Sequence, residues 1–285
     1  MNDYLLSTLL GIVEGVTEFI PVSSTAHLRI AEAILGMNLS DGYWKMFSIV
    51  IQFGPILCLP IYFRKHIAAL LSTFPDGARG DRTVVTHPLS LTMIAFVCTA
   101  GPAYLLTKII GKHLESLTLM ATSLIVGGIV MWIVDAMFSN RGKTTNMDEM
   151  SLPQAVWIGL CQILSAVFPG TSRSMSTIAA GQLAGMSRPA ALEFSFFLSM
   201  PTMFVATMYE LLKSLRHGGD PSEAVHMDSR GWVLLAIGTV IAFVVAYAVV
   251  AWFMDWVRSR GFVPFAIYRI LLGAAVFYWV MNTAH

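Results

Sequence analysis

Charged side chains are scarce in this chain of 285 residues, where Asp, Glu, Lys and Arg together make up only 12%. A soluble domain carries about 25% charged residues, so this composition excludes a surface that faces water on all sides. The 18 Lys and Arg residues are balanced by 17 Asp and Glu residues, which leaves a formal net charge of +1. That balance excludes the basic footprint expected of a nucleic-acid-binding protein.

Cysteines and N-terminal basic residues are also sparse. The three cysteines, Cys58, Cys98 and Cys161, are far apart within apolar runs and match neither a disulfide framework nor metal-ligand spacing. Residues 1–4 lack the basic region of a signal peptide, so we expect the first apolar segment to be retained. Hydrophobic residues, by contrast, reach 56%, with a mean hydropathy of +0.68. The composition predicts an all-α, polytopic membrane protein.

Six apolar windows are long enough to cross a bilayer, whose hydrocarbon core of about 30 Å requires roughly 20 residues of helix. They cover residues 44–63, 89–111, 117–138, 188–212, 231–256 and 262–283. The stretches 64–88, 139–152 and 257–261 contain most of the Lys and Arg residues between these windows. The positive-inside rule therefore predicts that these three stretches face the cytoplasm.

Two further apolar segments, residues 4–20 and 153–168, differ from ordinary spans. The first carries two glutamates and runs into a Pro-Val-Ser-Ser-Thr loop, and the second ends in Pro-Gly-Thr-Ser-Arg-Ser. A short helix-compatible segment, 26–35 or 175–184, follows each of them. Non-helical backbone at membrane depth persists only where protein or a wet cavity satisfies its polar groups. Each region is therefore predicted to be a re-entrant helix–loop–helix pair.

The two interrupted segments resemble each other. At one constant offset, five positions of the first match five of the second: Gly11 and Gly159, Glu14 and Gln162, Thr17 and Ser165, Pro21 and Pro169, Ser24 and Ser172. We predict one integral membrane domain, residues 1–285, with repeat halves at approximately 1–138 and 153–285. Each half would hold one re-entrant pair and three spans. Because three is an odd number, the second half would have the inverted orientation in the membrane. Inverted repeats with broken helices place their site near the midplane, where the halves meet.

Glu14 and Glu18 are four residues apart, so they lie on one face of a helix, about one turn apart. An ionised group at the centre of a lipid-facing helix costs about 2.5–3.5 kcal/mol on insertion scales. The two carboxylates are therefore expected to face a cavity, a cation or a metal. The alternative is a surface amphipathic helix, which the uncharged and mostly apolar stretch 5–13 disfavours.

The hydroxyl-rich loop Ser23-Ser24-Thr25 follows a proline that ends the first helix. Its hydroxyls either only cap the next helix or also take part in chemistry. His27 lies three residues beyond Ser24, which makes a Ser24–His27 hydrogen bond sterically reasonable. A lone histidine is more often structural than catalytic, but two carboxylates and three hydroxyls nearby favour a functional role.

The second loop supplies a fixed cation, because Arg173 stands between Ser172 and Ser174 at a predicted helix start, with Thr177 one turn further on. A helix N-terminus presents N–H donors to an anion, and arginine adds a planar fork that matches phosphate oxygens. The two loops together therefore predict a site for a phosphate-like anion within the membrane.

Carboxylates repel a phosphate unless a divalent cation lies between them, so we expect Mg²⁺ or Ca²⁺ as a cofactor held by Glu14 and Glu18. The residues alone leave open whether the anion is hydrolysed or carried.

The segments EGVTEFIPVSSTAH (14–27) and PGTSRS (169–174) resemble the two signature motifs of the bacterial undecaprenyl-diphosphatases, the bacitracin-resistance family. The similarity extends over nearly the whole chain and includes IQFG (51–54), GMSR (185–188), EFSF (193–196) and FVPFAIYR (262–269). The sequence departs from the expected pattern at Met175-Ser176, where Gly-Ala would be typical, but this change removes no polar group needed for chemistry.

The resemblance implies a multi-pass phosphatase of the bacterial cytoplasmic (inner) membrane. It would release phosphate from undecaprenyl diphosphate, a C55 isoprenyl diphosphate, and regenerate the monophosphate carrier of peptidoglycan synthesis, in a site open towards the periplasm. Bacitracin would be a partner only indirectly, through the shared substrate. The family's functional residues correspond here to Glu14, Glu18, Ser23, Ser24, His27, Ser172, Arg173 and Thr177.

Our hypothesis for the reaction makes Ser24 the nucleophile, activated by His27, and forms a phospho-enzyme that water resolves. A histidine nucleophile and direct attack by water are the alternatives. Glu14 and Glu18 bind the divalent ion, or one of them serves as the base. Substrate binding is assigned to the remaining polar residues of the two loops: Ser23, Thr25, Ser172, Arg173, Ser174 and Thr177.

The rival functional class is a lipid or anion transporter or flippase, because inverted repeats with paired half-helices are typical of transporters. The Ser24–His27 pair favours an enzyme, since a transporter needs no nucleophile. A non-catalytic scaffold explains the charged groups at membrane depth poorly. Arg269 and Glu193 are predicted to have structural partners, either each other or the backbone, and Gln52 either lines the site or bonds between helices. The oligomeric state, a homodimer included, stays open.

Overall fold

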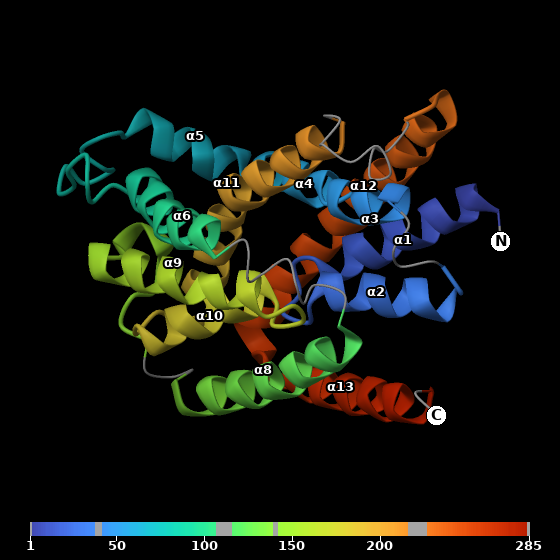
Figure 1. Ribbon diagram of the computed structural model, residues 1–285. Helices are drawn as coiled ribbons and strands as arrows, with labels where there is room; N and C mark the ends of the chain where they lie inside the picture. Colours follow the sequence, from blue (N-terminus) through green and yellow to red (C-terminus); the bar gives the residue numbers. More distant parts are fainter. Residues whose placement is uncertain (1, 38–41, 107–115, 139–141, 216–226, 284–285) are drawn as a thin grey trace.

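The computed structural model describes residues 2–37, 42–106, 116–138, 142–215 and 227–283 (Figure 1). This part of the chain contains α-helices, one short 3₁₀ helix and one isolated bridge, and no β-strand, which confirms the all-α prediction. Arg141, Arg216 and the end of the predicted window 89–111 lie outside the described residues.

The helices of the first part of the chain are α1 (Asp3–Thr17), α2 (Ser24–Ile34), α3 (Gly42–Val50), α4 (Phe53–Tyr62), α5 (Arg64–Ser72), α6 (Pro88–Leu105) and α8 (Leu117–Phe138). Their boundaries follow local chemistry, as α6 shows. Pro88 stands in its first turn, where the missing N–H costs nothing, and the His87 side chain accepts a hydrogen bond from the Leu89 N–H.

The second part of the chain contains η1 (Met147–Glu149), α9 (Leu152–Val167), α10 (Arg173–Leu183), α11 (Arg188–Leu215), α12 (Ser229–Arg260) and α13 (Val263–Thr283). The long helix α12 has a defined start and end. The Asp228 side chain accepts a 2.6 Å hydrogen bond from the Gly231 N–H, and the helix ends at Gly261, whose φ of +70° glycine adopts without a steric penalty.

Six segments of the described chain are long and apolar enough to cross a membrane: Gly42–Tyr62, Pro88–Leu105, Leu117–Phe138, Arg188–Lys213, Ser229–Arg260 and Val263–Asn282. They overlap the six predicted windows, so the chain is a multi-pass membrane protein. The first segment is interrupted, because α3 ends at Val50 and α4 begins at Phe53. This break leaves Gln52 at a helix junction, beside the site described below.

Two helical hairpins, α1–α2 and α9–α10, lie on opposite sides of the molecule, and both turn back near its middle (Figure 1). We call residues 18–23 the first loop and residues 168–172 the second loop. Glycines let each hairpin pack closely on a neighbouring helix. A Cβ at Gly11 would lie 2.6 Å from the Gly238 carbonyl oxygen of α12, and one at Gly159 would lie 2.4 Å from the Ala95 carbonyl oxygen of α6. The re-entrant course and the inverted repeat remain predictions.

The fully buried Asp135 of α8 connects several helices beyond the end of the second hairpin. It accepts two hydrogen bonds from Arg188 of α11, at 2.6 and 2.9 Å, and one from Gln182 of α10 at 3.0 Å. The backbone N–H of Phe262, just before α13, donates a further bond of 2.9 Å. A buried carboxylate is tolerated because it is paired and hydrogen-bonded in this way.

Candidate functional site

The start of α10 is in direct contact with the first loop. The Ser174 hydroxyl donates a hydrogen bond of 3.2 Å to the Ile20 carbonyl of the first loop. The fully buried Arg269 of α13 binds both loops, because it donates to the Pro21 carbonyl at 3.0 Å and to the Gly170 carbonyl at 3.1 Å. A third bond, of 3.1 Å, goes to the Ser123 carbonyl of α8. Arg269 therefore fixes the first loop, the second loop and α8 relative to one another.

Each loop ends in a serine with an unusual backbone conformation. Ser23 has φ 74° and Ser172 has φ 73°, in a left-handed region that residues other than glycine seldom adopt. Each is the N-cap of the helix that follows: Ser23 Oγ accepts from the Ala26 N–H at 3.4 Å, and Ser172 Oγ accepts from the Met175 N–H at 3.3 Å. Strained backbone of this kind is enriched at functional sites.

The carboxylate of Glu18 lies between the two helix starts. The Ser24 hydroxyl, at the start of α2, donates a 2.5 Å hydrogen bond to Glu18 Oε2. Arg173, at the start of α10, donates a 3.2 Å bond to Glu18 Oε1. The structure therefore brings together an acid, a hydroxyl and a guanidinium that are separated by up to 155 residues in the sequence.

Glu14, one turn before Glu18, is completely buried, and neither of its carboxylate oxygens has a hydrogen-bond partner. An unpaired buried carboxylate is costly, so this position calls for a proton or a cation. Among the described residues, no three or more His, Cys, Asp or Glu side chains form a cluster that could hold a metal ion. Any cation here would depend on the two carboxylates together with water or ligand oxygens.

Arg173 is also held by α11. It donates a 3.3 Å hydrogen bond to the Ser195 carbonyl of α11, while its Nε is buried without a partner. The predicted residue Thr177 lies one turn further along α10 and shares a 2.6 Å hydrogen bond with the Ser195 hydroxyl. Since Nε remains unpaired, the guanidinium retains a donor for an anion.

A cavity of about 200 Å³, which we call the loop cavity, lies between the two loops and the nearby helices. Polar side chains from both loops and from the starts of α2 and α10 line it, together with others from the α3–α4 junction, α9 and α11. These residues are Glu18, Ser23, Ser24, Thr25, Gln52, Ser165, Ser172, Arg173 and Thr202. Gln52 therefore takes the first of its two predicted roles and lines the site. The guanidinium and hydroxyl groups can donate hydrogen bonds to the oxygens of a phosphate-like anion, and the carboxylate can accept a proton.

The predicted hydrogen bond from Ser24 to His27 is not formed, because both ring nitrogens of His27 have other partners. Nδ1 donates to the Ser23 carbonyl at 2.7 Å, so in a neutral ring Nε2 accepts the 2.7 Å hydrogen bond from the Tyr268 hydroxyl of α13. The His27 and Tyr268 rings also stack, with centroids 5.6 Å apart. His27 therefore points away from Ser24, which bonds to Glu18 instead.

The other predicted binding residues divide into two groups. Ser23, Thr25 and Ser172 line the loop cavity together with Arg173. Ser174, in contrast, is almost completely buried and joins the two loops through Ile20. Ser174 is not among the residues that line the loop cavity, and its predicted role in substrate binding stays a prediction.

Three contributions were missed or left open by the sequence alone. Ser195 binds both Arg173 and Thr177, and the sequence analysis noted this position only as part of the family-like stretch EFSF (193–196). Arg269 bonds to backbone carbonyls through Nη1 and Nη2, which is one of its two predicted options, while its Nε is buried without a partner. Glu193 pairs with His66 of α5 at 3.0 Å, so the prediction that its partner is Arg269 or the backbone was wrong.

Comparisons of the sequence with a family model and with known proteins point to the same family. A sequence model of the family described as "Bacitracin resistance protein BacA" matches residues 7–275. The undecaprenyl-diphosphatase of Koribacter versatilis is 67% identical over 285 residues, covering 99% of this chain and 100% of that protein. Those of Caldanaerobacter subterraneus and Xanthomonas oryzae are 39% and 37% identical, covering 98% and 100% of this chain and 97% and 100% of theirs.

Proposed function

We propose a phosphatase activity for this chain, which belongs to the bacitracin resistance protein BacA family. The substrate is an isoprenyl diphosphate, undecaprenyl diphosphate by analogy with the relatives' names, and the products are the isoprenyl monophosphate and inorganic phosphate. The reaction takes place in the bacterial cytoplasmic membrane, with the loop cavity facing the periplasm. Bacitracin affects it only by competing for the same lipid.

The observation that carries this proposal is the contact of Glu18 with both Ser24 and Arg173. A hydroxyl that donates to a carboxylate at 2.5 Å already has its proton acceptor in place. The guanidinium on the other side of the same carboxylate can transfer its hydrogen bonds to phosphate oxygens when a diphosphate enters. Acid, nucleophile and anion receptor are then within one small cavity.

In the proposed reaction Ser24 Oγ attacks the terminal phosphorus as its proton passes to Glu18. The bond between that phosphorus and the bridging oxygen breaks, and the isoprenyl monophosphate leaves with the oxygen. Water then cleaves the phosphoserine, which restores the Ser24 hydroxyl and releases phosphate, while Glu18 loses its proton to solvent. Arg173 and the N–H groups at the start of α10 stabilise the charge that develops on the transferred phosphoryl group.

A divalent cation fits the two glutamates. Glu14 has two buried oxygens without partners, and oxygen ligands are those that Mg²⁺ and Ca²⁺ prefer. Mg²⁺ in particular is often held by one or two carboxylates together with substrate phosphates, which matches the small number of acidic groups here. When bound, the cation would neutralise phosphate charge and so allow the anion to approach Glu14 and Glu18.

The test is phosphate release from undecaprenyl diphosphate and from farnesyl diphosphate by the purified chain in detergent. We expect turnover that depends on Mg²⁺ or Ca²⁺ and is nearly abolished in Glu18→Gln, a variant that keeps the shape of the side chain. Brief reaction with substrate labelled in the terminal phosphate should leave the label on Ser24. Label on His27, or single-step hydrolysis without a covalent intermediate, would overturn the assignment of the nucleophile.

The same experiment separates an enzyme from a transporter. Transport requires sealed vesicles, whereas hydrolysis proceeds in detergent. A folded, purified chain that binds the diphosphate but releases no phosphate under any of these conditions would refute the phosphatase and leave the transporter reading.

A further inference from the structure

His27 stands one turn into α2, yet it is not among the residues that line the loop cavity. Both of its ring nitrogens are engaged elsewhere, Nδ1 with the Ser23 carbonyl and Nε2 with the Tyr268 hydroxyl, at 2.7 Å each. A side chain that attacks phosphorus or removes a proton has to reach the bound substrate. The position of His27 therefore suits a task other than contact with the reacting atoms.

The second hairpin has a serine where the first has His27. Counted from the caps, Ser176 follows Ser172 by four residues, just as His27 follows Ser23. In each hairpin the backbone N–H of that residue donates to the cap carbonyl, at 3.2 Å for Ser23 and 3.1 Å for Ser172. The side chain donates to the same carbonyl, at 2.7 Å from His27 and 3.1 Å from Ser176.

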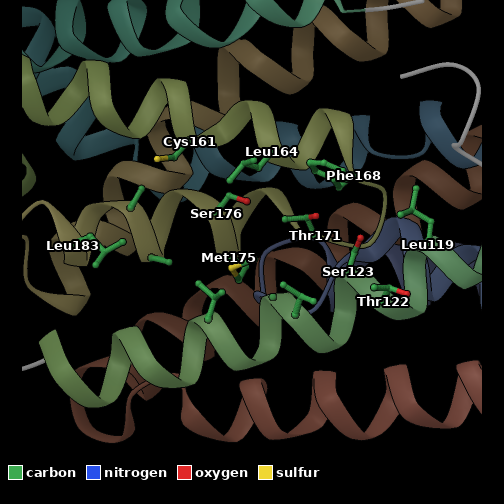
Figure 2. A pocket seen from close by; sticks show the side chains of 15 residues that line it. Leu119, Thr122, Ser123, Cys161, Leu164, Phe168, Thr171, Met175, Ser176 and Leu183 are labelled. Atoms are coloured by element: carbon green, nitrogen blue, oxygen red, sulfur yellow. The ribbon is translucent and has the colours of Figure 1, made fainter. Parts of the chain in front are cut away.

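Ser176 makes this bond without lining the loop cavity. It lines a separate cavity of about 430 Å³ between α8, α9 and α10 (Figure 2). A side-chain bond to the cap carbonyl is thus common to both hairpins, and in the second hairpin its donor has no contact with the space proposed for the diphosphate.

The bond to the Ser23 carbonyl restrains the peptide unit that joins Ser23 to Ser24. The carbonyl and the Ser24 N–H belong to one planar group, so the direction of the carbonyl helps to set the direction in which Ser24 leaves the turn. This restraint is needed because Ser23 has φ 74°, a conformation that persists in a residue other than glycine only where its surroundings hold it. With the turn held, the Ser24 hydroxyl meets Glu18 at 2.5 Å.

Two adjacent residues of α13 hold the first loop. Arg269 donates to the Pro21 carbonyl at 3.0 Å. Tyr268 reaches the Ser23 carbonyl through the imidazole of His27, whose ring stacks on that of the tyrosine. A hydroxyl that donates to Nε2 keeps the proton of a neutral ring on Nδ1, the nitrogen that faces the carbonyl. Tyr268 thus favours the tautomer that the turn requires.

We propose that His27 and Tyr268 are positioning residues for Ser24. Tyr268 orients the imidazole, and the imidazole holds the Ser23 carbonyl and with it the peptide unit of Ser24. This inference rests on the proposed phosphatase function, in which Ser24 attacks and Glu18 takes its proton. His27 contributes a hydrogen-bond donor at Nδ1, so a side chain that is neither base nor nucleophile can replace it if it places a donor there.

The first test compares two substitutions of His27. Asparagine and leucine are similar in size and branching, but only the asparagine amide places an N–H where histidine has Nδ1. His27→Leu should lower kcat by about 10²-fold, the loss expected when a reacting group is displaced, with little change in KM. His27→Asn should keep kcat within about tenfold of the wild type. An equal loss in both variants would show that the imidazole itself takes part in the reaction, and would overturn the proposal.

Tyr268→Phe removes the support of the ring. It should lower kcat by about tenfold and leave KM nearly unchanged, since one hydrogen bond is lost outside the loop cavity. In the His27→Asn background the same change should have no further effect, because Nε2 is absent. Additive losses would overturn the role of Tyr268 as a positioning residue for His27. The matched control is Tyr278→Phe, on the same helix and 73% exposed, which should resemble the wild type.

Nitrogen NMR of the chain labelled with ¹⁵N-histidine in detergent reports on the ring without turnover. At about pH 8 an ordinary histidine is neutral, and the signals that vanish in His27→Asn identify His27 among the seven histidines. We expect the proton on Nδ1 and a Nε2 signal that shifts in Tyr268→Phe but not in Tyr278→Phe. A proton on Nε2, or signals that ignore Tyr268→Phe, would overturn the proposal. The expected signals in a wild-type chain that releases no phosphate would refute the phosphatase and still support the orientation of the first loop by His27 and Tyr268.

Discussion

The first and second loops share one backbone arrangement and differ in the chemistry they carry. Each follows a helix that packs on its neighbour through a glycine, Gly11 or Gly159, and each ends in a serine cap with a positive φ. Measured from those caps, the first residue of α2 is Ser24 and the first residue of α10 is Arg173. Both of these residues bind Glu18. Equivalent positions thus supply a hydroxyl from one side and a cation from the other.

The acidic groups belong to one hairpin only. Glu14 is unpaired, whereas its sequence counterpart in the second hairpin, Gln162, donates hydrogen bonds of 3.2 Å to Thr99 and Thr202. The Gln162 amide nitrogen thus has two hydroxyl acceptors, although its Oε1 is buried without a partner. A neutral amide tolerates this better than a buried carboxylate, which requires a cation or a proton. The comparison shows that two turns of similar backbone conformation carry different polar groups.

The largest effect is expected from the residues that follow the two caps. Arg173→Ala should lower kcat/KM by about 10³-fold, since one preorganised donor in a site of this type contributes 10²–10³-fold and here a full charge is lost as well. Arg173→Lys should retain part of the activity, because a point charge remains without the planar fork. Phosphate release by purified protein is the measurement.

Ser24→Ala is the matched change in the first loop. If Ser24 is the nucleophile, it should abolish the labelled covalent intermediate, whereas Arg173→Ala should slow the formation of that intermediate without moving it. Equal amounts of label in wild type and Ser24→Ala would show that the two positions do not divide the chemistry as proposed.

Removal of the side chain that binds both loops is the next largest change. Arg269→Met should leave three buried carbonyls without their donor, at about 1–3 kcal/mol for each, and so lower the Tm in detergent by roughly 10 °C. Activity should fall mainly in kcat, because both loops lose their relative position. The exposed Arg258 provides a control, and Arg258→Met should change neither quantity. An unchanged Tm in Arg269→Met would show that the loops are fixed by other contacts.

The third prediction concerns the acidic pair. Glu14→Gln should lower activity by about 10²-fold and raise the concentration of Mg²⁺ or Ca²⁺ needed for half-maximal rate, since a cation stabilises phosphoryl charge by several kcal/mol. Gln162→Leu, the corresponding change in the second hairpin, should reduce activity less than tenfold and leave the cation requirement unaltered. A cation requirement unchanged by Glu14→Gln would exclude Glu14 as a ligand.

Much of the fold was predictable from the sequence, because hydropathy and length determine which helices can cross a bilayer. The six windows agree with the structure in number and place. The break between Val50 and Phe53 was less accessible. The helix junction at Gln52 depends on the packing of α3 and α4 against α11 and α12 rather than on local residues.

The members of the site were predicted better than their contacts. Glu18, Ser24 and Arg173 are brought together as the two motifs suggested. The prediction of a Ser24–His27 hydrogen bond was wrong. A spacing of three residues does not determine which side chain faces the loop, and the residue that bonds to His27 Nε2, Tyr268, lies 241 residues away in the sequence. The sequence match also paired Ser24 with Ser172, whereas the caps pair Ser23 with Ser172. Between the matched proline and the cap, the second loop has one residue more than the first, since Ser172 follows Pro169 by three positions and Ser23 follows Pro21 by two. A repeat pattern of so few identities does not reveal that difference.

The smallest effect is expected at two sets of ion pairs away from the loops, one between α5, η1 and α11 and one between α1 and α12. Before α9, His66 bonds to Asp148 and Glu193 at 3.0 Å each, and its hydrogen bonds to these two carboxylates raise its pKa to about 10. At the start of α1, Arg230 pairs with Asp3 at 2.8 Å in a more exposed setting. His66→Gln should lower the Tm at pH 7 by about 2–4 °C, the shift that roughly 1 kcal/mol produces in a protein of this size.

The pH dependence distinguishes the two sets of ion pairs. A histidine whose pKa is raised by folding contributes its stability fully below the unfolded value of about 6.5 and loses it as the pH rises through about 10. The Tm difference between wild type and His66→Gln should therefore be retained at pH 7 and vanish above pH 10. Arg230→Gln should cost less, because exposed pairs contribute about 0–1 kcal/mol, and its cost should not change over that range since arginine stays protonated. If the Tm difference between wild type and His66→Gln stayed constant up to pH 11, packing and not the charge on the imidazole would join α5 to η1 and α11.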